Sequence, residues 1–246
     1  MLTFIEISAI IVFAVSGLIE AVRKGMDIVG VFTVAFVAAF GGGTLRDVLL
    51  DRRPLFWVEH QEYVWLVMAL TLVVPPFTKF LGHRWAERVM QTTDALGLGL
   101  FAVSGAALGL AADLPLLPVV LIGVITGVFG GVLRDVLCNE IPVVFQAHRP
   151  YALCAFAGCW VFVGLETLGL ASWLALLAGT ATTAGLRLLV LAADWRIPPW
   201  PPAPRQWWLM IAFSSAPSRR MGQPKASARV SRSSSPVTKA SASPAS

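Results

Sequence analysis

Residues 41–49 read Gly41-Gly42-Gly43-Thr44-Leu45-Arg46-Asp47-Val48-Leu49, and the pattern returns as Gly130-Gly131-Val132-Leu133-Arg134-Asp135-Val136-Leu137. An offset of 88 positions aligns residues 13–57 with residues 101–145 without a gap, and 14 of the 45 aligned positions are identical. The identities include a Phe-Ala-Val-Ser-Gly segment, found at residues 13–17 and again at 101–105. Shared apolar composition does not readily produce so many identities in one register, so we infer an internal duplication.

The composition is that of a membrane protein. Hydrophobic residues make up 57% of the 246 residues and charged residues only 13%, against roughly 25% charged in an ordinary soluble domain. The net charge of +5 comes from the C-terminal tail, because residues 196–246 carry eight Lys and Arg and no acidic residue.

Seven apolar stretches are candidates for membrane-spanning helices, which need roughly 20 mostly apolar residues. They are approximately Leu2–Val22, Ile28–Leu50, Tyr63–Phe77, Asp94–Ala112, Leu116–Cys138, Tyr151–Leu170 and Ser172–Ala193. We expect Pro75-Pro76 to end the third helix, because prolines cannot continue the backbone hydrogen bonds. The sequence therefore predicts an all-α membrane protein with seven transmembrane helices.

Each copy of the duplication holds three of these helices. Since three is odd, the second copy must enter the membrane from the opposite side, and the repeats are predicted to be inverted. We expect the first three-helix repeat in residues 1–88 and the second in 89–170. Residues 171–195 form a seventh helix with a packing or oligomer-forming role, and residues 196–246 form a Pro/Trp-rich juxtamembrane segment and a disordered basic tail.

Lysine and arginine in the loops predict the orientation. If the N-terminus is outside, the inner loops receive most basic residues, including Arg23 and Lys24, and the outer side receives only Arg52 and Arg53. We expect a multi-pass protein of the cell inner (plasma) membrane, with its N-terminus outside and its C-terminus cytoplasmic.

The glycine runs predict breaks or kinks in the second and fifth helices, because each glycine costs about 1 kcal/mol relative to alanine in a helix interior. Backbone groups freed by a break are tolerated in a membrane only where they line a cavity. The expected pore and kink positions are Gly41, Gly42, Gly43, Gly130 and Gly131. Close helix packing is the alternative explanation for the stripe Gly123, Gly127 and Gly131.

The Arg-Asp pairs follow one short turn later. A charge at the centre of a membrane helix costs roughly 2.5–3.5 kcal/mol, and neighbours at i and i+1 point about 100° apart. We therefore predict pairing across the repeats, Arg46 with Asp135 and Arg134 with Asp47. In the alternative interpretation, both motifs lie at opposite membrane interfaces, where the arginines snorkel.

Other polar residues of the predicted helices have simpler expected roles. Glu6 aligns with Asp94, and both are expected in a first helical turn, where the helix dipole favours a carboxylate. Ser16 and Ser104 are candidate pore hydroxyls, unless they bond to their own helix backbone. Arg187, near the inner end of the last helix, is expected to snorkel.

Several functional classes are not expected. The sequence contains no Ser-His-Asp, Cys-His, phosphate-loop or zinc signature, and its three histidines lack metal-ligand spacing. We therefore expect no enzyme, no metal site, no cofactor and no nucleic-acid partner, whereas the basic tail favours contact with membrane lipids.

With the duplicated Gly-Gly-x-x-Arg-Asp and Phe-Ala-Val-Ser-Gly segments and seven helices, residues 4–195 resemble the prokaryotic trimeric intracellular cation (TRIC) channel family. The resemblance implies a homotrimer with one hourglass pore per subunit, lined by the kinked second and fifth helices and conducting K⁺. It places the kinks at the glycines above and the charged pore positions at Arg46, Asp47, Arg134 and Asp135.

The same bacterial family is also associated with uptake of glycine. We therefore expect a homotrimeric monovalent-cation (K⁺) channel, with a secondary transporter for glycine or another small neutral amino acid as the alternative. A zwitterion would use both ends of a broken helix, whereas K⁺ would need mainly carbonyl and hydroxyl oxygens. A lipid-associated scaffold is a third hypothesis, which requires Arg46 and Arg134 to face lipid.

Overall fold

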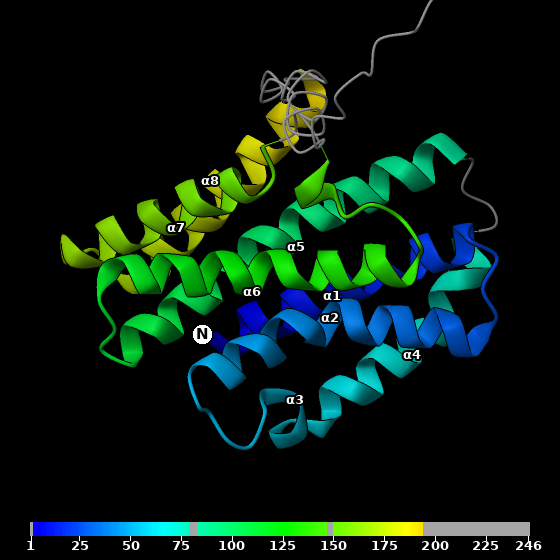
Figure 1. The fold of residues 1–246 in the computed structure, drawn as a ribbon, viewed down its shortest axis with the longest axis horizontal. Helices are drawn as coiled ribbons and strands as arrows, with labels where there is room; N and C mark the ends of the chain where they lie inside the picture. The colour runs from blue at the N-terminus through cyan, green and yellow to red at the C-terminus, as the bar shows by residue number, and fades with distance from the viewer. Residues whose placement is uncertain (1, 79–82, 147–149, 194–246) are drawn as a thin grey trace, which may run out of the picture. The chain divides into compact units, whose positions relative to one another are not determined.

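The computed structural model describes residues 2–78, 83–146 and 150–193, which form an all-helical fold (Figure 1). The elements are α1 Leu2–Arg23, α2 Ile28–Leu49, α3 Phe56–Glu59, α4 Gln61–Thr78, α5 His83–Ala111, α6 Leu116–Leu137, the 3₁₀ helix η1 Val143–Phe145, α7 Ala152–Thr167 and α8 Ser172–Ala192. Within the described residues, α1, α2, α5, α6 and α8 are long and apolar enough to cross a membrane. The predicted juxtamembrane segment and basic tail lie outside the described residues.

The helices repeat in the predicted order. The first copy is α1, α2 and α4, and the second is α5, α6 and α7. Contacts between the copies run from α1 to α5 and from α2 to α6, while α4 packs on the first copy and α7 on the second. Figure 1 shows α2 and α6 running in opposite directions, as inverted repeats require. Helix α8 stands outside the duplication and packs on α5 and α7.

The contact between α1 and α5 lies on the internal symmetry. Phe13 and Phe101 occupy equivalent positions in the two repeats, and their rings stack with centroids 5.6 Å apart and planes inclined by 30°. Both side chains are buried. An aromatic pair of this kind adds about 0.5–1.5 kcal/mol beyond its area burial. The two copies of the Phe-Ala-Val-Ser-Gly segment therefore stabilise the contact between the repeats.

The duplication extends to the turns that end the long helices. Gly25 and Asp113 are equivalent and have φ of 70° and 54°, and Asp51 and Asn139 are equivalent with φ of 51° and 56°. In all four turns the next amide donates to the carbonyl five residues back, as Arg52 does to Asp47. These are Schellman caps, in which glycine, asparagine or aspartate best tolerates the left-handed conformation.

Two predictions of helix boundaries need correction. Helix α4 does not end at Pro75 and Pro76 but continues to Thr78; each proline removes one backbone hydrogen bond, and the helix extends only two residues beyond Pro76. Helix α5 begins at His83 rather than near Asp94. The first turns of α5 are polar, so a search for apolar stretches did not identify them as part of the helix.

Candidate functional site

The glycine runs lie in uninterrupted helices, so the predicted helix break is wrong for α2 and α6. Each glycine of the first run faces a different neighbour at a distance that a side chain would not fit. A methyl group at Gly41 would lie 2.6 Å from Leu133 Cδ1, and one at Gly43 would lie 2.4 Å from the Phe56 ring. Three adjacent glycines are therefore explained by packing in three directions.

The closest approach joins α2 to α6. A methyl group at Gly42 would lie 2.0 Å from the carbonyl oxygen of Thr126, and one at Gly130 would lie 2.4 Å from that of Ala38. The 88-residue offset relates these two contacts, so the antiparallel helices cross on the internal symmetry at a point where only glycine fits. Arg46 and Arg134 each follow their glycine by four residues, about 6 Å along the helix, and are carried away from the crossing in opposite directions.

Arg134 is the centre of a buried ionic cluster, which we call the second half-site: Asp94, Arg134 and Asp135. Arg134 is 1% exposed. Its Nη1 donates to Asp94 Oδ1 at 2.7 Å, and its Nε and Nη2 donate to Asp135 Oδ1 at 3.0 and 2.8 Å. Nη1 also donates to Ser16 Oγ at 2.5 Å, a contact between the repeats.

The first half-site repeats this arrangement with Glu6, Arg46 and Asp47. Arg46 is fully buried; its Nη1 donates to Glu6 Oε1 at 3.0 Å and its Nε to Asp47 Oδ1 at 2.9 Å. Nη2 lies 2.8 Å from the same Asp47 oxygen but makes no hydrogen bond. The guanidinium also lies 5.1 Å from the centroid of the Phe56 ring.

The predicted pairing of Arg46 with Asp135 and Arg134 with Asp47 is therefore wrong, since each arginine binds two carboxylates of its own repeat. The arginine side chain is long enough to turn back to the neighbouring aspartate, despite the 100° between them. Burial of both guanidinium groups also removes the interpretation in which they snorkel.

The two aspartates have a second role at their other oxygens. Asp47 Oδ2 accepts a hydrogen bond from the amide of Phe56 at 2.8 Å, and Asp135 Oδ2 accepts one from the amide of Val143 at 3.0 Å. These amides belong to the first residues of α3 and η1, whose free N–H groups need acceptors. The half-sites therefore also fix the loops that follow α2 and α6.

Several site residues were not recognised from the sequence. Glu6 and Asp94 lie beyond the first turns of α1 and α5, and bind the arginines instead of serving as dipole partners. Tyr63 and Tyr151, also 88 positions apart, are buried and their hydroxyls have no hydrogen-bond partner among the described residues. The 88-residue offset aligned Glu6 with Asp94 in the sequence without showing their role, and the same offset could have identified Tyr63 and Tyr151.

The two candidate pore hydroxyls differ in their contacts. Ser16 and Ser104 are both fully buried, but Ser16 accepts from Arg134 whereas Ser104 Oγ has no hydrogen-bond partner in the described part of the chain. Neither forms the bond to its own helix backbone that was the alternative.

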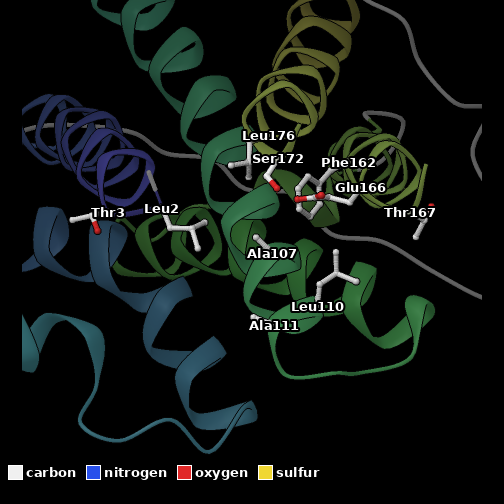
Figure 2. A pocket seen from close by; sticks show the side chains of 10 residues that line it. All are labelled: Leu2, Thr3, Ala107, Leu110, Ala111, Phe162, Glu166, Thr167, Ser172 and Leu176. Carbon is white, nitrogen blue, oxygen red and sulfur yellow. The ribbon is translucent and has the colours of Figure 1, made fainter. Parts of the chain in front are cut away.

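A cavity of about 710 Å³ lies at the ends of α1, α5, α7 and α8, and no half-site residue lines it (Figure 2). Its polar lining comes from Thr3, Glu166, Thr167 and Ser172, and Figure 2 shows Glu166 beside Phe162 and Ser172. None of the predicted site residues lines it.

A further contact between the repeats lies outside the spanning segments. Lys24, after α1, pairs with Glu140, after α6. The hydrogen bond between them raises the pKa of Lys24 above 10.5 and lowers the pKa of Glu140 below 4.5. Both groups are solvent-exposed, so this pair contributes less to stability than the buried clusters.

A family model described as "Glycine transporter" matches residues 3–79 and again residues 91–167. The two matches are offset by the 88 positions that relate the half-sites. The chain belongs to the glycine transporter family. This double match confirms the duplication. The resemblance of the sequence to TRIC channels is confirmed by solved structures of that family, which are similar to this chain.

Similar curated proteins align with more than three-quarters of this chain. A membrane protein of the UPF0126 family from Vibrio cholerae is 37% identical over 191 residues, 76% of this chain and 78% of the relative. The Escherichia coli inner membrane protein YadS is 31% identical over 195 residues, 79% of this chain and 94% of the relative.

Solved structures agree with the fold. The TRIC trimeric intracellular cation channel orthologue from Rhodobacter sphaeroides is 35% identical, with a TM-score of 0.74 over 78% of this chain and 98% of that one. A prokaryotic TRIC channel crystallised in 0.5 M KCl is 31% identical, with a TM-score of 0.74 over 80% of this chain and 98% of that one. The all-α fold with two repeats of three helices and a further helix is therefore that of TRIC channels.

Proposed function

We propose that the protein is a homotrimeric monovalent-cation channel conducting K⁺, with one path per subunit along α2 and α6. The observation that carries this proposal is the charge of the half-sites. Each holds one guanidinium against two carboxylates, so within each buried cluster the carboxylates outnumber the guanidinium group by one, before the flanking, solvent-exposed Arg52 is counted. Carboxylates at such positions attract cations and repel anions.

The glycines serve this path by bringing α2 and α6 together between the half-sites. Gly42 and Gly130 set the crossing, and Gly41, Gly43 and Gly131 admit the side chains around it. Ser104 and the two tyrosine hydroxyls supply buried oxygens without partners among the described residues, and Ser16, which accepts from Arg134, supplies a further buried oxygen. Hydroxyl and carboxylate oxygens of this kind replace the hydration shell of a monovalent cation.

The comparisons support a channel and a trimer. The similar solved structures are named as TRIC cation channels, and the one from Rhodobacter sphaeroides as trimeric. Identity above 30% over about four-fifths of the chain supports transfer of these properties. We assign α8, which lies outside the duplication, to packing and subunit contacts.

The proposed location is the inner membrane, like that of the Escherichia coli relative. The proposed orientation has the N-terminus outside, because Arg23, Lys24, Arg84 and Arg88 then lie on the cytoplasmic side. Membrane lipids are the surrounding partners, and transported K⁺ is a substrate rather than a cofactor.

A glycine carrier is the second candidate, favoured by the description of the matching family. The excess carboxylate of a half-site could hold an ammonium group, and the adjacent arginine a carboxylate group. The two functions predict different cargo for the same residues.

Proteoliposomes distinguish the two candidates. Vesicles loaded with KCl and diluted into N-methyl-D-glucamine chloride should develop an inside-negative potential without an ionophore. The double variant Glu6→Gln with Asp94→Asn should reduce it, whereas Gly185→Ala should not, because a methyl group there meets no atom within 4 Å. No potential, together with saturable glycine uptake that the double variant abolishes, would establish the carrier instead.

A further inference from the structure

Arg187 of α8 is a buried cation that the duplicated motifs do not include. It is 3% exposed, and its Nε and Nη1 have no hydrogen-bond partner in the described part of the chain. No described carboxylate forms an ion pair with it; its guanidinium instead lies 4.8 Å from the centroid of the Tyr151 ring. The expected snorkelling of Arg187 is therefore wrong. A buried charge in a membrane protein needs compensation and marks a functional position.

The compensating charge lies at the other end of Tyr151. A methyl group placed at Gly131 would lie 3.2 Å from the Tyr151 hydroxyl oxygen and 3.5 Å from Asp94 Oδ1. The tyrosine therefore extends from Arg187 to the second half-site, whose two carboxylates exceed its single guanidinium by one negative charge.

In the first half-site, the negative charge is balanced by a solvent-exposed arginine, Arg52. Arg52 Nη1 lies 3.7 Å from Asp47 Oδ1, on a side chain that is 42% exposed. The position equivalent to Arg52 in the second repeat is Glu140, which has the opposite charge. The equivalent of Tyr151 is Tyr63, whose ring has His60 rather than an arginine beside it, at 5.0 Å.

We propose that Arg187 is the charge-balancing residue of the second half-site and sets its affinity for cations. A helix outside the duplication thus supplies the charge that the second repeat lacks. Arg187 acts across Tyr151 and is buried, whereas Arg52 is open to solvent, so the two halves of the path differ in electrostatics although their motifs are the same. This inference rests on the proposed cation path.

Three variants test the role of Arg187 in planar bilayers. Removing a nearby unit charge at an effective dielectric constant of about 20 changes binding by on the order of tenfold. Arg187→Gln should therefore lower the KCl concentration at half-maximal conductance about tenfold and increase selectivity for K⁺ over Cl⁻. Arg187→Lys retains the charge and should stay near the wild type. Arg88→Gln is the matched control, because Arg88 also stacks on an aromatic ring, that of Trp85 at 5.6 Å, but is exposed.

A second measurement keeps this inference separate from the proposed function. The thermal midpoint of the purified protein is titrated with KCl, with N-methyl-D-glucamine chloride holding the ionic strength constant. The KCl concentration for half-maximal stabilisation should fall about tenfold in Arg187→Gln and not in Arg88→Gln. Equal curves for wild type and Arg187→Gln overturn the assignment whether or not the protein conducts, whereas a shifted curve in a protein that does not conduct overturns only the channel.

Discussion

At the scale of single residues, loss of the arginine of a half-site should destabilise the protein more than loss of one carboxylate charge. Arg134→Gln leaves Asp94 and Asp135 buried together without a guanidinium, and should cost about 3–5 kcal/mol. Asp94→Asn keeps the Arg134–Asp135 ion pair and an amide oxygen that can still accept from Arg134. Tyr151 still separates Arg187 from the cluster, so Asp94→Asn should cost less, about 1 kcal/mol. Thermal unfolding of the purified variants checks this order. An equal loss in both variants would contradict the central role of Arg134 in the half-site.

The pair of Lys24 and Glu140 should give a pH-dependent contribution to stability. Since the folded-state pKa of Glu140 is lowered, its stabilisation is complete above the ordinary value of 4.5 and is lost as the pH falls through the folded value. Since the pKa of Lys24 is raised, the same stabilisation is lost again as the pH rises above 10.5. The difference in thermal midpoint between wild type and Glu140→Gln should therefore be present at neutral pH and disappear in acid. A difference that persists in acid contradicts the ion pair.

The sequence identified the arginines and aspartates but not their partners. The angle of about 100° between neighbouring helical residues fixes only the directions of their Cα–Cβ bonds. The arginine side chain is long and flexible, so its nitrogens can still reach the carboxylate of the next residue. Asp94 was assigned to a first turn because the polar start of α5 could not be recognised by apolar content, whereas Glu6 lies just beyond the first turn of α1. Their true partners become evident only when the helices are assembled.

At the scale of elements, the glycines of α2 should differ in their tolerance of a methyl group. Gly42→Ala would bring a methyl group to 2.0 Å from the Thr126 backbone, so α2 and α6 must separate, at a cost of about 1–3 kcal/mol. Gly41→Ala meets only the end of the Leu133 side chain, which can move, and should cost less. Gly185→Ala meets nothing and should be neutral or stabilising.

Thermal unfolding of the three alanine variants ranks them directly. If Gly42→Ala is no more destabilising than Gly185→Ala, the close helix crossing is contradicted.

The sequence indicated a structural role for the glycine runs but favoured a helix break. Their packing partners come from other elements, α3 and α6, and so could not be identified from the sequence.

At the scale of the whole molecule, a membrane-spanning α5 must have its two ends on opposite sides of the membrane, and the inverted repeats require it to run opposite to α1. Arg84 and Ala112 are exposed near those ends, and the native cysteines are buried. In intact cells, a membrane-impermeant maleimide should label Ala112→Cys, and label Arg84→Cys only after the membrane is permeabilised. The reverse pattern would invert the proposed orientation.

The architecture was largely predictable because it depends on a repeated signal. Seven apolar stretches and one constant offset determine which helices are equivalent and that their repeats are inverted. The charge supplied by Arg187 was not predictable, because α8 has no counterpart in the duplication and its contact with Tyr151 arises from packing alone.

Single-channel recording of the purified protein in planar bilayers under a KCl gradient tests the central claim most directly. Half-sites with excess carboxylate predict discrete currents that reverse close to the K⁺ equilibrium potential, and that persist in Gly185→Ala. Bilayers that remain silent with a correctly folded protein, or currents that reverse near the Cl⁻ potential, would contradict a cation channel.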